Sequence, residues 1–295
     1  LLSSKPTPFK VETGAQFLAC GHLLGEVTCL FVLFLYDRLR VRPHLTPAFT
    51  TTTGAPERKV IPLLRSSFPL MAQQLILAFA RIAESILLPK LLTKGGLSAT
   101  EIAQQLGEYW EMATPLIFFP LILFAPVSTL LLPATARATV KKNLPAYFRK
   151  IRWLLGGALL YSLGVVFLLL KLATPLSLLL YKTTVAIRYL PFLLPALPFL
   201  VMNNLLTPVV EGLGKQKFLL RTTLILIFIK TGITAAFVPL PAFGLAGAAW
   251  AVTISQALLF CLLLKETFFT AANPKGFFLF RAKFFPLIYK NIKWP

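Results

Sequence analysis

Charged and amide side chains interrupt an apolar stretch early in the chain. The segment LAFARIAESILLP, residues 77–89, places Arg81 and Glu84 one helical turn apart, and Gln73 and Gln74 lie about two turns upstream. An arginine and a carboxylate at this spacing can pair. A guanidinium also stays charged in a dry site, where it binds phosphate through two hydrogen bonds. The stretch predicts either the wall of a substrate-binding cavity or a structural set, with Arg81 reaching the lipid headgroups.

Two further sets of ionisable residues lie within apolar sequence. His22 and Glu26 are four residues apart, so they share one face of a helix. Imidazole titrates near neutral pH, and the pair is either proton-linked or a structural hydrogen-bonded pair. Lys230 stands alone in LILIFIKTGITAAF. Because a lysine inside a membrane helix needs a partner, water or an anion, Lys230 is another candidate for the cavity.

The sequence lacks the residue patterns of an enzyme active site or a metal centre. It has no Ser/His/Asp set, no clustered carboxylates and no metal-spaced His/Glu motif, and its three cysteines lie in apolar sequence without ligand spacing. We therefore expect no catalysis, no metal and no cofactor. A membrane-embedded glycosyltransferase or polymerase stays open as an alternative, for which Glu101, Glu108 and Glu111 are available without convincing pairing.

The composition indicates which elements must position these side chains. Hydrophobic residues make up 57% of the 295 residues and charged residues 14%, whereas about a quarter of a soluble chain is charged. Several apolar runs reach the roughly 20 residues that cross a bilayer as a helix. We predict an all-α fold, a polytopic bundle of transmembrane helices. Its seven spans are expected at residues 14–36, 63–89, 111–133, 151–171, 190–211, 218–238 and 243–264.

Membrane topology explains the formal net charge of +20 better than nucleic-acid binding does. Basic residues are abundant in alternate loops, as the positive-inside rule requires, and we therefore expect no nucleic-acid partner. The pattern predicts a multi-pass plasma-membrane protein in contact with membrane lipids, with Leu1 outside and Pro295 in the cytoplasm. Because the chain opens on Leu1 and a polar stretch, we expect it to be a segment of a longer protein. The sequence predicts no oligomeric state.

Prolines and small residues modify the predicted helices. Each proline inside a span removes a helix hydrogen bond, so bends are expected there. These prolines are Pro69, Pro115, Pro120, Pro126, Pro191, Pro195, Pro198 and Pro208. The segment FGLAGAAWA, residues 243–251, has small residues four apart, which favours close helix packing.

Several segments follow one another in an order that resembles a known family. They are GEVTCLFVLFLY, SSFPLMAQQLILAFARIAESILLPKLL, GLSATEIAQQLGEYWEMATPLIFFP, LLPATA, NNLLTPVVEGLGKQ and FGLAGAAWAVTISQALL. Together they are similar to stage V sporulation protein B-like polysaccharide-biosynthesis flippases of the MOP (MATE/MurJ-like) exporter superfamily. The similarity covers most of residues 14–265.

The resemblance implies a domain organisation. Family members have two six-helix lobes, so residues 1–36 would end with the last helix of a truncated first lobe. Residues 37–62 would form a cytoplasmic linker between lobes, and residues 63–265 the complete second lobe. Residues 266–295 form a basic, aromatic tail that is cytoplasmic or interfacial.

The resemblance also implies a function, alternating-access movement of a lipid-linked sugar diphosphate across the membrane. In that reading Arg81 contacts the diphosphate and Glu84 is its counterion. Two rivals stay open besides the enzyme: a MATE-type multidrug or cation antiporter with the same helix plan, which acidic residues in the cavity would favour, and a truncated, inactive reading frame.

Overall fold

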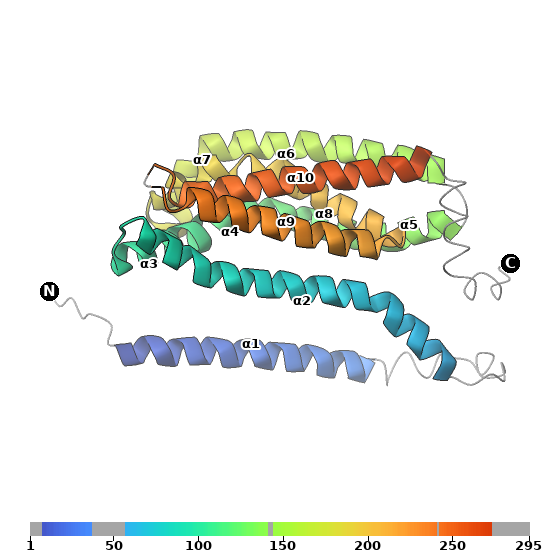
Figure 1. Ribbon diagram of the computed structural model, residues 1–295, viewed down its shortest axis with the longest axis horizontal. Helices are drawn as coiled ribbons and strands as arrows, with labels where there is room; N and C mark the ends of the chain where they lie inside the picture. The colour runs from blue at the N-terminus through green and yellow to red at the C-terminus, as the bar shows by residue number, and fades with distance from the viewer. Residues whose placement is uncertain (1–7, 37–56, 141–143, 241, 273–295) are drawn as a thin grey trace. The chain divides into compact units, whose positions relative to one another are not determined.

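The computed structural model describes residues 8–36, 57–140, 144–240 and 242–272, which form helices and no strands (Figure 1). The chain divides into two units, residues 1–62 and 63–295. The first unit contains α1 (Pro8–Tyr36), which has apolar residues on all sides from Leu23 onward. A helix that is apolar all round is typical of a membrane environment.

The second unit contains the remaining helices. Its long helices are α2 (Glu57–Lys94, of which residues from 63 belong to this unit), α5 (Ala125–Val140), α6 (Leu144–Tyr181), α8 (Ala196–Gly212), α9 (Gln216–Phe237) and α10 (Leu245–Ala272). Its short helices are α3 (Ala99–Gly107), α4 (Thr114–Phe118) and α7 (Leu190–Leu193), with a π-helix at Glu108–Ala113 and 3₁₀ turns at Phe119–Phe124 and Val185–Arg188. The predicted all-α bundle is confirmed.

Helix α8 is the centre of the second unit and packs against α5, α6, α9 and α10. Its side chains at Leu197, Val201 and Val209 are fully buried. Close packing depends on glycine at Gly212, where an added Cβ would lie 2.6 Å from Cβ of Thr135 on α5. Gly214 then ends the helix in a left-handed conformation, with φ of +76°, which glycine adopts at little cost.

Small residues bring α10 close to its neighbours, as the sequence predicts. Ala248 and Ala251 are buried, and a Cβ added at Gly247 would lie 2.8 Å from Cβ of Phe237 at the end of α9. Close packing of this kind stabilises helix contacts through van der Waals interactions. It does not depend on the hydrophobic effect, which does not drive helices together within lipid.

The helical path from α3 to α5 is irregular where the sequence has prolines. A π-helix precedes Pro115, and the 3₁₀ turn at Phe119–Phe124 contains Pro120. Since proline has no N–H, the regular hydrogen-bond ladder cannot continue through these positions. Pro208, by contrast, lies inside a continuous α8.

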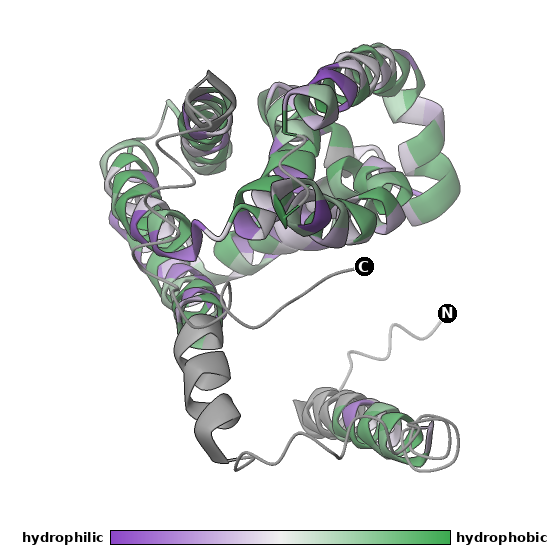
Figure 2. Ribbon diagram, turned by 90° about the vertical axis from the view of Figure 1, so that its right-hand side faces the viewer, coloured by the Kyte–Doolittle hydropathy of each residue, from purple (hydrophilic) through white to green (hydrophobic). Residues whose placement is uncertain are grey.

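All seven predicted spans fall on helical segments. Four helical segments of the described chain are long and apolar enough to cross a membrane, namely Ala99–Val140, Leu144–Tyr181, Gln216–Phe237 and Leu245–Phe268. Large apolar side chains such as Leu160 and Phe228 are exposed on the outside of the bundle, and hydrophobic residues occur along all of its helices (Figure 2). Such surface suits lipid and not water, and the protein is a multi-pass membrane protein.

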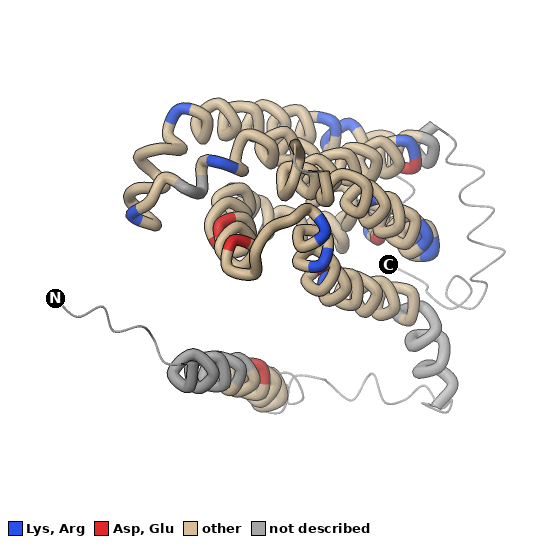
Figure 3. The backbone as a smooth tube through the Cα atoms, turned by 60° about the vertical axis from the view of Figure 1, so that its left-hand side comes forward, with Lys and Arg blue, Asp and Glu red and all other residues tan. Residues whose placement is uncertain are grey.

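Helix α6 is longer than its predicted span of 151–171. Its 38 residues correspond to about 57 Å at about 1.5 Å per residue, against a hydrocarbon thickness of about 30 Å. The helix therefore extends beyond the hydrocarbon layer, and its early turns carry Arg149, Lys150 and Arg152. Basic residues lie mainly toward the helix ends in the second unit (Figure 3).

Candidate functional site

An ion pair joins α2 to α9 inside otherwise apolar sequence. Nζ of Lys230 lies 2.7 Å from Oε2 of Glu84, and each side chain is about a quarter exposed. The pair is separated by 146 positions in the chain. Lys230 thus has the partner that its position in the sequence requires.

A second polar contact lies further along the same two helices. Nε2 of Gln73 on α2 donates a hydrogen bond to Oγ1 of Thr223 on α9, over 3.2 Å. Gln73 and Glu84 are eleven residues apart, which is about three helical turns, and Thr223 and Lys230 are two turns apart. Each helix therefore presents both of its residues on one face, and the two helices run in the same direction. We call these four residues the α2–α9 polar seam.

Apolar packing fixes the seam at one end. Leu88, Leu91 and Leu92, in the last turns of α2, are buried. Beyond them, a Cβ added at Gly95 would lie 3.2 Å from the carbonyl oxygen of Pro239. This end of α2 is held by hydrophobic burial, whereas Glu84 and Gln73 provide side-chain hydrogen bonds to α9.

Arg81 does not pair with Glu84 in the described chain, contrary to the pairing expected from their spacing. The Glu84 carboxylate bonds to Lys230, while the Arg81 side chain is exposed one turn away. The physical reason is that Lys230 is half-buried on the neighbouring helix and cannot reach solvent as easily as Arg81 can. Glu84, the expected counterion of Arg81, is therefore paired with Lys230.

The two glutamines next to each other differ in environment. Gln73 is buried, and its Oε1 has no hydrogen-bond partner within the described residues. Gln74 is exposed. A buried unpaired acceptor is costly, and it is available to a ligand or a water molecule.

His22 and Glu26 lie on α1 in the first unit. The Glu26 side chain is exposed, and the His22 side chain is outside the described part of the structure. Their proposed pairing stays a prediction.

Sequence reasoning missed a cluster of amide and hydroxyl side chains at the junction of α5, α8 and α10. Nδ2 of Asn203 donates to the carbonyl oxygen of Gln256 at 2.9 Å and to its Oε1 at 2.8 Å. Ser128 donates to Oδ1 of Asn204. Oδ1 of Asn203 is buried without a partner in the described chain. The NN dipeptide within an apolar span is a signal that could have located this cluster.

A polar cavity adjoins this cluster, with a volume of about 630 Å³. Thr207 and Glu211 also line it, at four-residue intervals from Asn203, and so they continue one face of α8. The second unit therefore has two polar regions inside an apolar bundle, the seam and this cavity.

These features define a class of protein: a multi-pass α-helical membrane protein with ionised and amide groups inside its helix bundle. Such groups in membrane helices mark the paths of substrates or ions. The chain is similar to "Stage V sporulation protein B" of Bacillus subtilis (strain 168), with 23% identity over 255 residues. The alignment covers 85% of this chain and 48% of that protein, so the chain spans about half the length of this relative.

This similarity confirms the resemblance inferred from the segments of the sequence. No family model matches the chain, and no solved structure matches it.

Proposed function

We propose that the protein is a flippase of the alternating-access type, in which the α2–α9 polar seam forms part of the cavity wall. Its cargo would be a lipid-linked oligosaccharide or peptidoglycan precursor, moved across the plasma membrane for polysaccharide, cell-wall or spore-cortex synthesis. The Glu84–Lys230 ion pair, with Arg81 one helical turn away, is the main support for this function.

The charges of this region suit an anionic headgroup. Arg81 and Lys230 contribute two positive charges and Glu84 one negative charge, which leaves an excess of one cation beside apolar helices. A diphosphate would accept two parallel hydrogen bonds from the Arg81 guanidinium. It would also compete with the Glu84 carboxylate for the Lys230 ammonium.

This competition would couple binding to helix movement. When the headgroup takes Lys230, α2 loses its ion pair with α9 and retains the weaker Gln73–Thr223 hydrogen bond. A ligand shifts a conformational equilibrium only through its different affinity for the two states, and the exchange of partners at Lys230 supplies such a difference. Movement of this kind needs neither a catalytic group nor a cofactor. In the membrane, the positive-inside pattern would place Pro295 on the cytoplasmic side.

Reconstitution of the full-length protein in liposomes tests the proposal. The probe is a fluorescent polyprenyl-diphosphate sugar, whose transfer between leaflets is followed by quenching with an impermeant reductant. We expect transfer by the wild type and by Arg221→Gln, a cation change elsewhere on α9, and at least about tenfold slower transfer by Lys230→Gln. Equal rates for the two variants would contradict the role of Lys230.

A cation antiporter is the alternative, and the carboxylate of Glu84 is the observation that favours it. Ethidium uptake driven by a pH or sodium gradient tests it in the same liposomes. Uptake that requires Glu84, without transfer of the lipid probe, would replace the flippase with the antiporter.

A further inference from the structure

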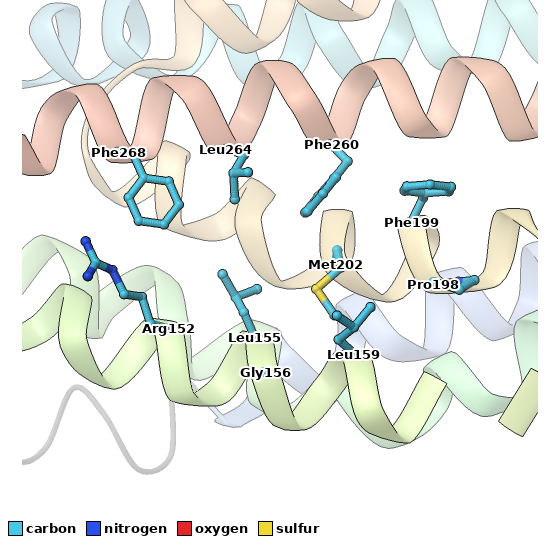
Figure 4. A pocket seen from close by; sticks show the side chains of 10 residues that line it. All are labelled: Arg152, Leu155, Gly156, Leu159, Pro198, Phe199, Met202, Phe260, Leu264 and Phe268. Atoms are coloured by element: carbon cyan, nitrogen blue, oxygen red, sulfur yellow. The ribbon is translucent and has the colours of Figure 1, made fainter. Parts of the chain in front are cut away.

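An apolar groove on the outside of the second unit has an arginine at one end. Its volume is about 350 Å³, and its walls are formed by α6 and α10 with α8 as the floor. The side chains of Phe260, Leu264 and Phe268 point from α10 toward α6, and Arg152 faces Phe268 (Figure 4). Of the ten residues that line the groove, Arg152 alone has a polar side chain.

Helical periodicity builds the groove. Arg152, Gly156 and Leu159 on α6 follow at spacings of four and three residues, so they share one face. Phe260 and Phe268 are two turns apart on α10. Both walls therefore extend for about 10–12 Å at about 1.5 Å per residue. The floor includes Met202, which is buried.

The groove's position and charge indicate what occupies it. Trp153, beside Arg152, is 81% exposed, and tryptophan and arginine together are typical of the boundary between lipid tails and headgroups. Arg149 lies one turn earlier on the same face of α6 and is also exposed. No carboxylate lies within ion-pair distance of Arg152 among the described residues.

We propose that this groove is a binding site for an anionic phospholipid, separate from the α2–α9 polar seam. One acyl chain lies between α6 and α10 on the side chain of Met202, and the phosphate group binds Arg152. The apolar walls offer no hydrogen bonds to a sugar or a peptide, whereas a hydrocarbon chain needs none. The guanidinium of Arg152 is 5.0 Å from the centre of the Phe268 ring, a stacking contact that leaves its N–H edge available for phosphate oxygens.

Gly156 makes the groove accessible to a chain. A Cβ added there meets no atom within 4 Å, and the same holds for its neighbour Gly157, which does not line the groove. Leucine at either position is a better helix former than glycine. Leucine at 156 extends into the groove, whereas leucine at 157 lies on a different face of α6. The two substitutions are therefore a matched pair.

Native mass spectrometry of the full-length protein in detergent provides the test. The probes are dioleoyl phosphatidylglycerol and dioleoyl phosphatidylcholine, which share their acyl chains and differ in headgroup charge. We expect the wild type and Gly157→Leu to retain phosphatidylglycerol about tenfold more strongly than phosphatidylcholine. Gly156→Leu should lose both lipids, and Arg152→Gln should lose the preference for phosphatidylglycerol while Arg152→Lys keeps part of it.

Three results would overturn the site. They are equal retention of the two lipids by the wild type, unchanged retention by Gly156→Leu, and equal losses in Gly156→Leu and Gly157→Leu. A thermal melt of each variant accompanies the measurement, so that loss of lipid is compared only among folded proteins. If the wild type instead has the mass of a dimer and Gly156→Leu has the mass of a monomer, the groove binds a second copy of the chain and the lipid site is rejected.

Discussion

Nζ of Lys230 on α9 lies 2.7 Å from Oε2 of Glu84 on α2, and so two helices that are distant in sequence share a charge pair inside an apolar bundle. The pair has a structural consequence that is independent of transport. Each side chain stabilises the charge of the other in this apolar environment, so removal of one leaves an unpaired charge.

A double-mutant cycle measures this dependence. Lys230→Met leaves the Glu84 carboxylate without its cation. Breaking a fully buried pair costs roughly 3–5 kcal/mol, and because this one is about a quarter exposed we expect on the order of 2 kcal/mol. Adding Glu84→Gln should restore most of the free energy of unfolding, as measured by denaturation in detergent. If the effects of the two substitutions on the free energy of unfolding are strictly additive, the ion pair does not contribute to stability.

Gly212 provides a prediction about packing between α8 and α5. Gly212→Ala places a Cβ at 2.6 Å from Cβ of Thr135 and 2.8 Å from the carbonyl oxygen of Leu132. Because the backbone atoms next to this Cβ cannot move aside easily, we expect the free energy of unfolding to fall by about 1–3 kcal/mol, the usual effect of overpacking. Gly232→Ala on α9 is the control, because its added Cβ meets nothing within 4 Å. A melting temperature that falls equally in both variants would reject the close approach.

Asn203 provides a prediction about pH. Its Nδ2 donates to two oxygens of Gln256, so Asn203→Asp replaces a donor with an ionised acceptor and should destabilise the protein more than Asn203→Leu. Protonation of the introduced carboxyl restores a donor. The deficit of Asn203→Asp relative to Asn203→Leu should therefore shrink as the pH falls, as followed by melting temperature between neutral and acidic buffer. A pH-independent difference would contradict the hydrogen-bond assignment.

The elements of the fold could be predicted from the sequence because their signals are local. Apolar runs located helical segments at all seven predicted positions, four of which are long and apolar enough to cross a membrane. Prolines such as Pro115 and Pro120 marked the irregular turns, and small residues such as Ala248 marked close packing. The length of α6 was underestimated, since its ends leave the hydrocarbon layer and no longer need apolar residues.

The contacts of the candidate site could not be predicted in the same way. Arg81 and Glu84 are neighbours on one helix, and their spacing favoured a pair, but Lys230 on α9 is the partner of Glu84. That choice depends on how α2 and α9 are rotated against each other, and the burial of apolar side chains such as Leu88 and Leu92 on α2 contributes to that rotation. The bonds between Asn203 and Gln256 depend in the same way on the packing of α8 against α10.

In the proposed mechanism the cargo's diphosphate binds Arg81, which lies beside the seam, together with Lys230 of the seam, and Arg81→Ala in the full-length protein is the decisive test. The side chain is exposed and makes no ion pair with Glu84 in the described chain, so its loss should leave membrane insertion and melting temperature unchanged. We expect that Arg81→Ala abolishes transfer of the fluorescent polyprenyl-diphosphate sugar in liposomes. Transfer at the wild-type rate by a correctly inserted Arg81→Ala protein would contradict it.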